Sequence, residues 1–147
     1  MSTEAQFWTR ILGGCWAPDR LLNRIENGVL DGMPDCYTVI SGVANWLELK
    51  CPSEPKRFNT ALFGSAHRLS QTQANWLITH RQAGGRGWVA IETDTYVLLV
   101  GAQFADSINT STLGQLSQRA AFVGRRPLNP LNWAEFVNTL TDTRSLP

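Results

Sequence analysis

Three side chains in the first 50 residues of the chain are suited to phosphodiester hydrolysis: Asp35, Glu48 and Lys50. Carboxylate oxygens are hard ligands for a divalent cation, and a neighbouring ammonium can orient an attacking water or neutralise developing charge. Residues two apart in a strand share a face, so Glu48 and Lys50 should project together while Leu47 and Leu49 pack against the core. The spacing predicts a carboxylate and an ammonium side by side.

Whether Asp35 joins this pair depends on the register of a predicted hairpin. The segments on either side of residues 41–44 have strand-like composition, and four residues are few enough to join two antiparallel strands. A four-residue loop pairs Ile40 with Asn45 and, further along, Asp35 with Lys50, which brings the three polar side chains to one face. A slip of one residue would turn Asp35 to the opposite face and remove the site.

A Glu-x-Lys triplet alone predicts little, because an exposed pair on an amphipathic strand is far commoner than a catalytic one. Its context here is more specific. Pro34-Asp35 precedes the triplet at hairpin distance, and a basic segment follows it. The chain has two lysines against eleven arginines, and one lysine stands beside Glu48. Only lysine offers a compact charge with a readily shifted pKa there.

The composition indicates one globular domain. The chain has 147 residues, 43% of them hydrophobic and six of them tryptophan, which is enough for one sizeable core and short for two. No apolar run approaches the length of a membrane helix, and the Met1–Glu4 start lacks the features of a secretory signal, so we expect an intracellular protein. Three cysteines without a Cys-x-x-Cys pair favour reduced buried thiols over disulfides or a zinc site.

The net charge is only +1, but the charges are unevenly distributed. Residues 51–90 contain five basic side chains and a single acid, Glu54. This segment could face phosphates, although a solvated surface explains scattered arginines equally well. The basic residues are Lys56, Arg57, Arg68, Arg81 and Arg86.

Caps and apolar periodicity predict the elements that must position these side chains. Thr3 and Ser70 are candidate helix caps, and residues 21–26 can form a strand or a helical turn. Residues 51–68 form a long loop of the kind that is functional or mobile in compact domains. The predicted order is helix, strands, helix, strands and helix, at residues 4–12, 35–40 and 45–51, 71–82, 87–92 and 95–100, and 131–140.

A series of motifs lies in this framework: Glu4 in the early helix, Arg24-Ile25-Glu26-Asn27, Gly32-Met33-Pro34-Asp35, Trp46-Leu47-Glu48-Leu49-Lys50, Leu69-Ser70-Gln71-Thr72-Gln73, and Gln82-Ala83-Gly84-Gly85. Together, over roughly residues 4–100, they resemble the PD-(D/E)XK nuclease superfamily. Within it, they are similar to the small phage and bacterial VRR-NUC enzymes related to archaeal Holliday-junction resolvases. The resemblance implies an α/β, restriction-endonuclease-like core with a mixed central β-sheet flanked by helices.

The resemblance also implies roles for the site residues. Asp35 and Glu48 would bind Mg²⁺, with Mn²⁺ as a substitute, and the Leu49 carbonyl could complete the coordination. Lys50 would position or activate water. Glu4 would support the metal site from its helix, with Glu26 as a competitor for that role.

Two further features are less closely tied to the family pattern. Gln73 would face the site from its helix as a water or phosphate ligand, or be an ordinary exposed polar residue. This chain has a long loop at residues 51–68, whereas simpler members of the family pass quickly from the catalytic strand to the next helix. Four residues of the loop would bind DNA phosphates: Lys56, Arg57, His67 and Arg68. The alternative is a mobile surface loop without a role.

The function implied is a metal-dependent DNA endonuclease of phage or prophage type, in the cytoplasm of a bacterium or an infected host. We expect a single nuclease domain over 1–147, with a core at about 3–101 and a C-terminal helical extension at about 105–147. A junction-resolving or homing-like enzyme needs a homodimer, which the apolar strand at 97–100 or the C-terminal helix could form, whereas a lone chain would nick or trim flaps. No membrane or organic cofactor is implied. The alternatives are a non-cleaving DNA-binding module with the same fold, and an unrelated α/β protein.

Overall fold

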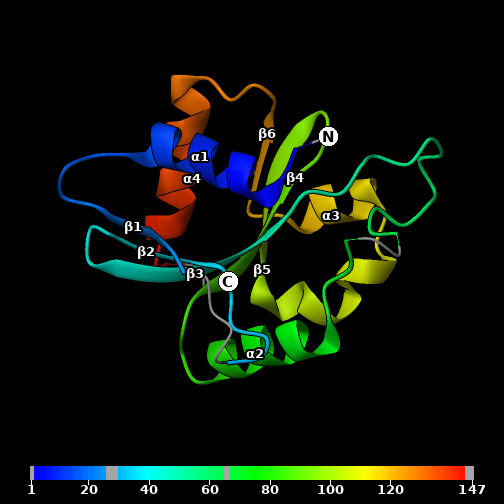
Figure 1. Ribbon diagram of the computed structural model, residues 1–147, viewed down its shortest axis with the longest axis horizontal. Coiled ribbons are helices and arrows are strands. Elements are labelled where there is room, and N and C mark those ends of the chain that lie inside the picture. The colour runs from blue at the N-terminus through cyan, green and yellow to red at the C-terminus, as the bar shows by residue number, and fades with distance from the viewer. Residues whose placement is uncertain (1, 26–29, 65–66, 145–147) are drawn as a thin grey trace.

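The computed structural model describes residues 2–25, 30–64 and 67–144, which contain one six-stranded sheet with helices on both faces (Figure 1). The strands follow one another across the sheet in chain order, and every neighbouring pair is antiparallel except β3 and β4, which are parallel. The predicted mixed sheet is therefore present. The strands are β1 (Leu21–Arg24), β2 (Cys36–Ile40), β3 (Val43–Lys50), β4 (Gly87–Glu92), β5 (Tyr96–Gly101) and β6 (Phe122–Arg125).

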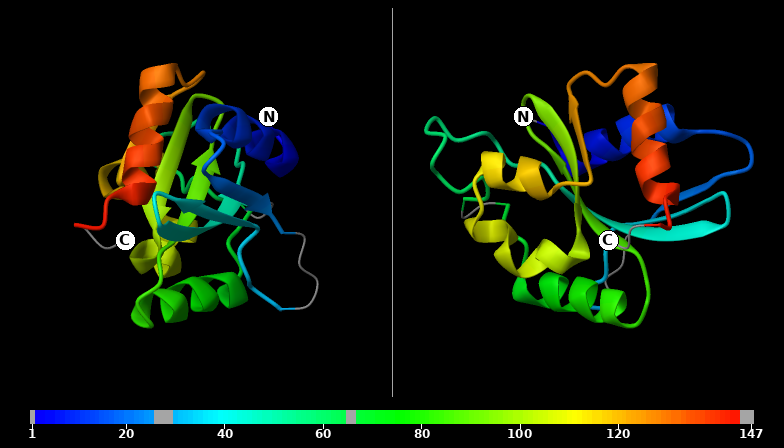
Figure 2. Two further views of the ribbon diagram at one scale, coloured as in Figure 1. Left: turned by 90° about the vertical axis from the view of Figure 1, so that its left-hand side faces the viewer. Right: turned by 180° about the vertical axis from the view of Figure 1, so that it is seen from behind.

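Two layers of helices cover the sheet, as the turned views in Figure 2 show. Helices α1 (Glu4–Cys15) and α4 (Pro130–Thr141) pack on one face, where Phe7, Ile11 and Phe136 are buried. Helix α2 (Gln71–Gln82), the 3₁₀ helix η1 (Ala102–Thr110) and α3 (Leu113–Arg119) cover the other face. Because β4 and β5 are covered by apolar layers on both faces, their sequences are nearly continuous hydrophobic runs.

The β2–β3 hairpin has a tighter turn than the sequence suggested. Ser41 and Gly42 have φ angles of 53° and 75°, so both adopt the left-handed conformation of a two-residue turn whose twist suits a hairpin. Ile40 therefore pairs with Val43, and the predicted pairing of Ile40 with Asn45 is wrong by two residues. Since side chains alternate with a period of two, this shift leaves each side chain on its predicted face.

Two predicted helix caps are confirmed, and one predicted helix end is wrong. Thr3 accepts a hydrogen bond from the backbone of Gln6, and Ser70 does the same for its own helix. Helix α1 runs past the glycine pair that was expected to end it, as far as Cys15. A Cβ at Gly14 would lie 2.1 Å from the Trp133 ring, so this glycine permits close packing of α1 against α4.

The C-terminal third is more than a helical extension. It contributes β6, which pairs with β5, and α4, whose Phe136 and Leu140 are fully buried in the core. Because β5 has neighbours on both sides and is buried, residues 97–100 cannot pair with a second copy, so that proposed dimer contact is wrong. None of the described helices is long and apolar enough to cross a membrane. Cys15, Cys36 and Cys51 are buried free thiols, as expected.

Candidate functional site

Strand β3 presents Glu48 and Lys50 on the face covered by α2 and η1. Leu47 and Leu49 alternate with them and are fully buried in the cluster beneath α1 and α4, as predicted. Glu48 is 2% exposed and Lys50 is 8% exposed. Both charged groups are thus held in a largely dry environment, where a pair of opposite charges interacts more strongly than in water.

Asp35 lies one residue before β2, next to Glu48. Cys36 pairs with Leu47, so continuing the register by one residue sets Asp35 opposite Glu48 and not opposite Lys50. Its Oδ2 accepts a hydrogen bond of 3.2 Å from the Leu49 amide, and its carboxyl group is close enough to Glu48 to raise the pKa of that acid. The tight hairpin therefore brings the two acids directly together.

The backbone around Asp35 fixes its position. The Asp35 carbonyl accepts a hydrogen bond of 2.6 Å from the Ile25 amide, which extends the pairing of β1 with β2 by one step. The amide and carbonyl of one strand residue point to the same edge, so the Leu49 carbonyl is directed to the side on which Asp35 lies. Three oxygen-bearing groups, from Asp35, Glu48 and Leu49, are thus assembled at the end of β2.

The electrostatics of Glu48 indicate a missing positive charge. Burial raises the pKa of Glu48 well above its ordinary value, the neighbouring Asp35 carboxyl group raises it further, and Lys50 lowers it. Its Oε1 is buried and has no hydrogen-bond partner among the described residues. Such an atom is costly to leave unsatisfied. A divalent cation bound between these acids would satisfy that oxygen and relieve their repulsion, so the residues present fit one.

A metal centre built here would rest on few protein ligands. Within the described ranges, no group of three or more His, Cys, Asp and Glu side chains is arranged to hold a metal. Two carboxylates and one carbonyl are a donor set that suits Mg²⁺, which usually keeps several of its waters and binds through one or two carboxylates.

Lys50 links β3 to the end of the long loop. Its Nζ donates a hydrogen bond of 3.2 Å to the Arg68 carbonyl. Its charge lowers the pKa values of both Glu48 and Glu4. Lys50 is therefore a cation that β3 supplies to the acidic cluster of Asp35, Glu48 and Glu4.

Glu4, at the start of α1, belongs to the same electrostatic cluster. Burial raises its pKa and so does the charge of Asp35, whereas Lys50, Arg24 and His67 lower it. Glu4 is thus close enough to the acid pair to act on it. Its predicted competitor, Glu26, lies outside the described residues.

Arg24 is a neighbour of the site that was not predicted from the sequence. It pairs with Cys36 at the end of β1, one residue from Asp35, and its charge acts on the pKa of Glu4. Its position in a motif beside the predicted site was the available signal. Predicting its nearness also required knowing that residues 21–24 form a strand that pairs with β2.

The side chain of Gln73 has a hydrogen-bond partner at the start of its own helix. Its side-chain oxygen accepts a hydrogen bond of 3.0 Å from the Ser70 amide, which completes the capping box of α2. The structure thus gives Gln73 a part in helix capping, and its contact with substrate stays a prediction.

The four basic residues predicted to bind DNA divide into two pairs. His67 influences the pKa of Glu4, and Arg68 contacts Lys50 through its carbonyl, so these two adjoin the acid cluster. Lys56 and Arg57 are exposed further out on the loop. The structure does not bring the two pairs together.

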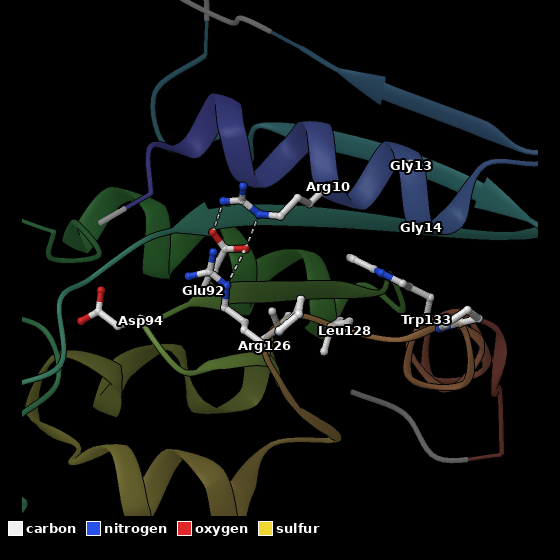
Figure 3. A pocket seen from close by; sticks show the side chains of 11 residues that line it. Arg10, Gly13, Gly14, Glu92, Asp94, Arg126, Leu128 and Trp133 are labelled. Carbon is white, nitrogen blue, oxygen red and sulfur yellow. Dashed lines mark hydrogen bonds and ion pairs between the residues drawn. The ribbon is translucent and has the colours of Figure 1, made fainter.

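A pocket of about 630 Å³ opens on the opposite face of the sheet, beside Glu92 (Figure 3). Glu92 is 2% exposed, and its carboxylate accepts hydrogen bonds from Arg10, one of them 2.8 Å long. Arg126 adds an ion pair at 3.6 Å. This buried acid is already paired with two arginines, and the sheet lies between its pocket and the face that carries Glu48. The pocket is therefore a separate feature from the acid cluster.

Comparison with solved structures shows what this fold resembles. The chain is similar to Hjc, a Holliday junction resolvase from the archaeal hyperthermophile Archaeoglobus fulgidus. The TM-score is 0.54 at 18% sequence identity, and the match covers 77% of this chain and 89% of that chain. No protein-family model matches the sequence, and no curated protein matches it. At this identity the likeness shows the fold, and the predicted restriction-endonuclease-like core is confirmed.

Proposed function

We propose that this protein is a metal-dependent DNA endonuclease, with Asp35, Glu48 and Lys50 at its catalytic centre. The observation that carries the proposal is the buried Glu48 oxygen, which has no hydrogen-bond partner in the described part of the chain and lies beside Asp35 and Lys50. A pure DNA-binding module has no use for two buried acids next to phosphates, which they repel. The resolvase-like fold supports the same conclusion.

The proposed roles follow from the position of each group. Asp35, Glu48 and the Leu49 carbonyl would hold Mg²⁺ or Mn²⁺, and Glu4 would support them from α1. When bound, the ion polarises a phosphoryl oxygen and lowers the pKa of water. Asp35 is kept in place by the Leu49 amide, so its oxygen needs little reorganisation to act as a ligand.

Lys50 would orient the attacking water or offset negative charge on the scissile phosphate. Its Nζ is held by the Arg68 carbonyl, which leaves its remaining hydrogens available for a phosphate oxygen or water. His67, Arg68 and Arg24 lie around this cluster and would contact flanking phosphates. The two arginines would offset the repulsion between the acids and the DNA backbone.

The proposal also covers the type of nuclease and its oligomeric state. We infer a phage- or prophage-type enzyme that acts in the cytoplasm of a bacterium or infected host. Cutting two strands symmetrically needs a homodimer, and β5 is excluded as its contact because both of its edges are paired. A dimer would therefore form through α4 or another exposed surface.

Cleavage of defined DNA substrates tests this function. The purified protein is incubated with supercoiled plasmid, linear duplex and a synthetic four-way junction, in Mg²⁺, Mn²⁺, Ca²⁺ or EDTA. We expect cutting in Mg²⁺ and Mn²⁺ and none in EDTA, and the preferred substrate will define the subclass. DNA binding without cutting in every metal would instead identify a non-cleaving binding module.

A further inference from the structure

Residues 51–68, which we call the arm, begin and end at the proposed catalytic lysine. The arm leaves β3 directly after Lys50, and the Arg68 carbonyl at its far end accepts the hydrogen bond from Lys50 Nζ. In Figure 1 the arm extends outward past α3. Whatever the arm contacts is therefore placed at a defined position relative to the acid cluster.

Anchors on both sides hold the described part of the arm against the body of the protein. On the outgoing side, Glu54 accepts a hydrogen bond of 2.8 Å from the Thr95 hydroxyl. On the returning side, the Leu62 amide donates to the Ser111 carbonyl at 3.0 Å, and Leu62 and Phe63 are buried. The segment between these anchors forms a supported tip.

The tip presents an aromatic ring beside two cations. A turn closed by a hydrogen bond of 3.2 Å from the Thr60 amide to the Arg57 carbonyl carries Phe58, whose side chain is 92% exposed. The neighbouring Lys56 and Arg57 are also exposed. The outgoing anchor uses Glu54, the only acid of the arm, so the tip itself carries positive charge alone.

Leu131 provides a comparison for this exposed ring. It is 75% exposed at the start of α4. Its chain neighbours are Pro130 and Asn132, neither of them charged. Isolated exposed apolar residues are ordinary on protein surfaces. Phe58 differs because it is aromatic, supported on a turn, flanked by cations and carried by a segment that starts and ends at Lys50.

We propose that Phe58 is a wedge that inserts between bases of the DNA substrate while Lys56 and Arg57 hold the adjoining phosphates. This inference rests on the proposed nuclease function. Apolar side chains that enter a base step must separate the stacked bases, which is easiest where pairing is already interrupted. The arm therefore favours branched or partly unpaired DNA over an intact duplex, and this names the substrate class.

A base-unstacking assay tests the wedge directly. Binding is measured in Ca²⁺ with a four-way junction that carries 2-aminopurine beside the branch point, and with a duplex of matching sequence. The wild type should raise the 2-aminopurine fluorescence of the junction. Phe58→Ala should lose most of that increase and bind the junction about tenfold more weakly, with duplex affinity unchanged, whereas Phe58→Trp should retain both properties.

Two further variants separate the wedge from simpler effects. Leu131→Ala removes the comparable exposed apolar side chain and should retain the wild-type fluorescence increase. Its oligomeric state is measured alongside, because α4 is a proposed dimer contact. The double variant Lys56→Gln, Arg57→Gln should weaken binding to junction and duplex alike. The dependence of the DNA affinity on salt concentration should fall by the amount expected for the loss of about two phosphate contacts. Because all of these side chains are exposed, thermal unfolding should be unchanged in every variant.

Distinct outcomes would overturn the inference. Wild-type fluorescence and junction affinity in Phe58→Ala would exclude a wedge while leaving the nuclease function intact. A change in oligomeric state in that variant, measured by sedimentation and with DNA binding preserved, would assign Phe58 to a contact between two copies of the chain. Failure of the wild type to bind any DNA would refute the proposed function and the wedge together.

Discussion

Replacing Lys50 with alanine is expected to lower the DNA cleavage rate by a factor on the order of 10²–10⁴, the range typical for loss of a positioned catalytic group. The substitution removes the ammonium that lowers the pKa of Glu48 and that would meet the scissile phosphate or its attacking water. The measurement is single-turnover cleavage with saturating protein, which separates the chemical step from DNA binding. The affinity for DNA should fall far less than the rate.

The chain contains a natural control, because its only other lysine is Lys56 on the arm. Lys56→Ala removes the same charge from an exposed position on the arm; it should weaken DNA binding but leave the single-turnover rate at saturating protein within about threefold of the wild type. Lys50→Arg should fail to restore activity, because the larger planar guanidinium does not fit a site that is 8% exposed. Equal losses in the Lys50→Ala and Lys56→Ala variants would show that net charge matters and position does not.

Replacing Glu48 with glutamine should abolish cleavage and at the same time stabilise the fold. The wild-type protein buries this acid beside Asp35, which raises its pKa above the ordinary value of 4.5. The stabilising effect of the protonated acid is complete below about pH 4.5 and is lost as the pH rises toward the raised pKa. Glutamine cannot ionise, so its advantage over glutamate grows with pH.

Thermal unfolding in EDTA checks this expectation. At about pH 8 we expect Glu48→Gln to gain about 1 kcal/mol in the free energy of unfolding, or roughly 3 °C in Tm, and at about pH 4.5 the gain should largely disappear. Glu135→Gln, at an exposed position on α4, is the matched control and should show no such trend. A lower Tm for Glu48→Gln at both pH values would mean that Glu48 contributes to the fold and is not a strained functional group.

Local sequence signals were sufficient for the elements nearest the site. Ser70 followed by Gln73 predicts a capped helix, and α2 has the predicted bounds of residues 71–82. Alternation in the Trp46–Lys50 segment correctly separated the apolar face of β3 from the face that bears Glu48 and Lys50. These predictions succeeded because they depend on hydrogen bonds and periodicity within a few residues.

Features that depend on distant packing could not be predicted. Nothing local indicates that Gly14 meets Trp133 across two helices, which lets α1 continue past its glycines. The two-residue turn requires Ser41 to adopt a positive φ, which is unusual for serine, so the register was misjudged by two residues. Strand β6 was missed because four residues give too short a pattern for alternation to stand out.

The candidate site shows the same division. Strand spacing alone paired Glu48 with Lys50. Asp35 reaches the same face with either the predicted four-residue loop or the observed two-residue turn, because the two registers differ by an even number of residues. The nearness of Arg24 to Asp35 could be predicted only from the pairing of β1 with β2. The exposure of Phe58 could be predicted only from the contacts that anchor the arm. Gln73 shows the reverse case, since one residue can match both a catalytic motif and a helix cap.

Mn²⁺ binding in the absence of DNA, measured by electron paramagnetic resonance, tests most directly the central claim that Asp35 and Glu48 form one cation site. Wild type, Asp35→Asn and the control Glu135→Gln are titrated side by side. We predict that the wild type and the control bind Mn²⁺ with equal affinity, that Mg²⁺ displaces it, and that Asp35→Asn binds at least about tenfold more weakly. Binding by Asp35→Asn with wild-type affinity would contradict the claim.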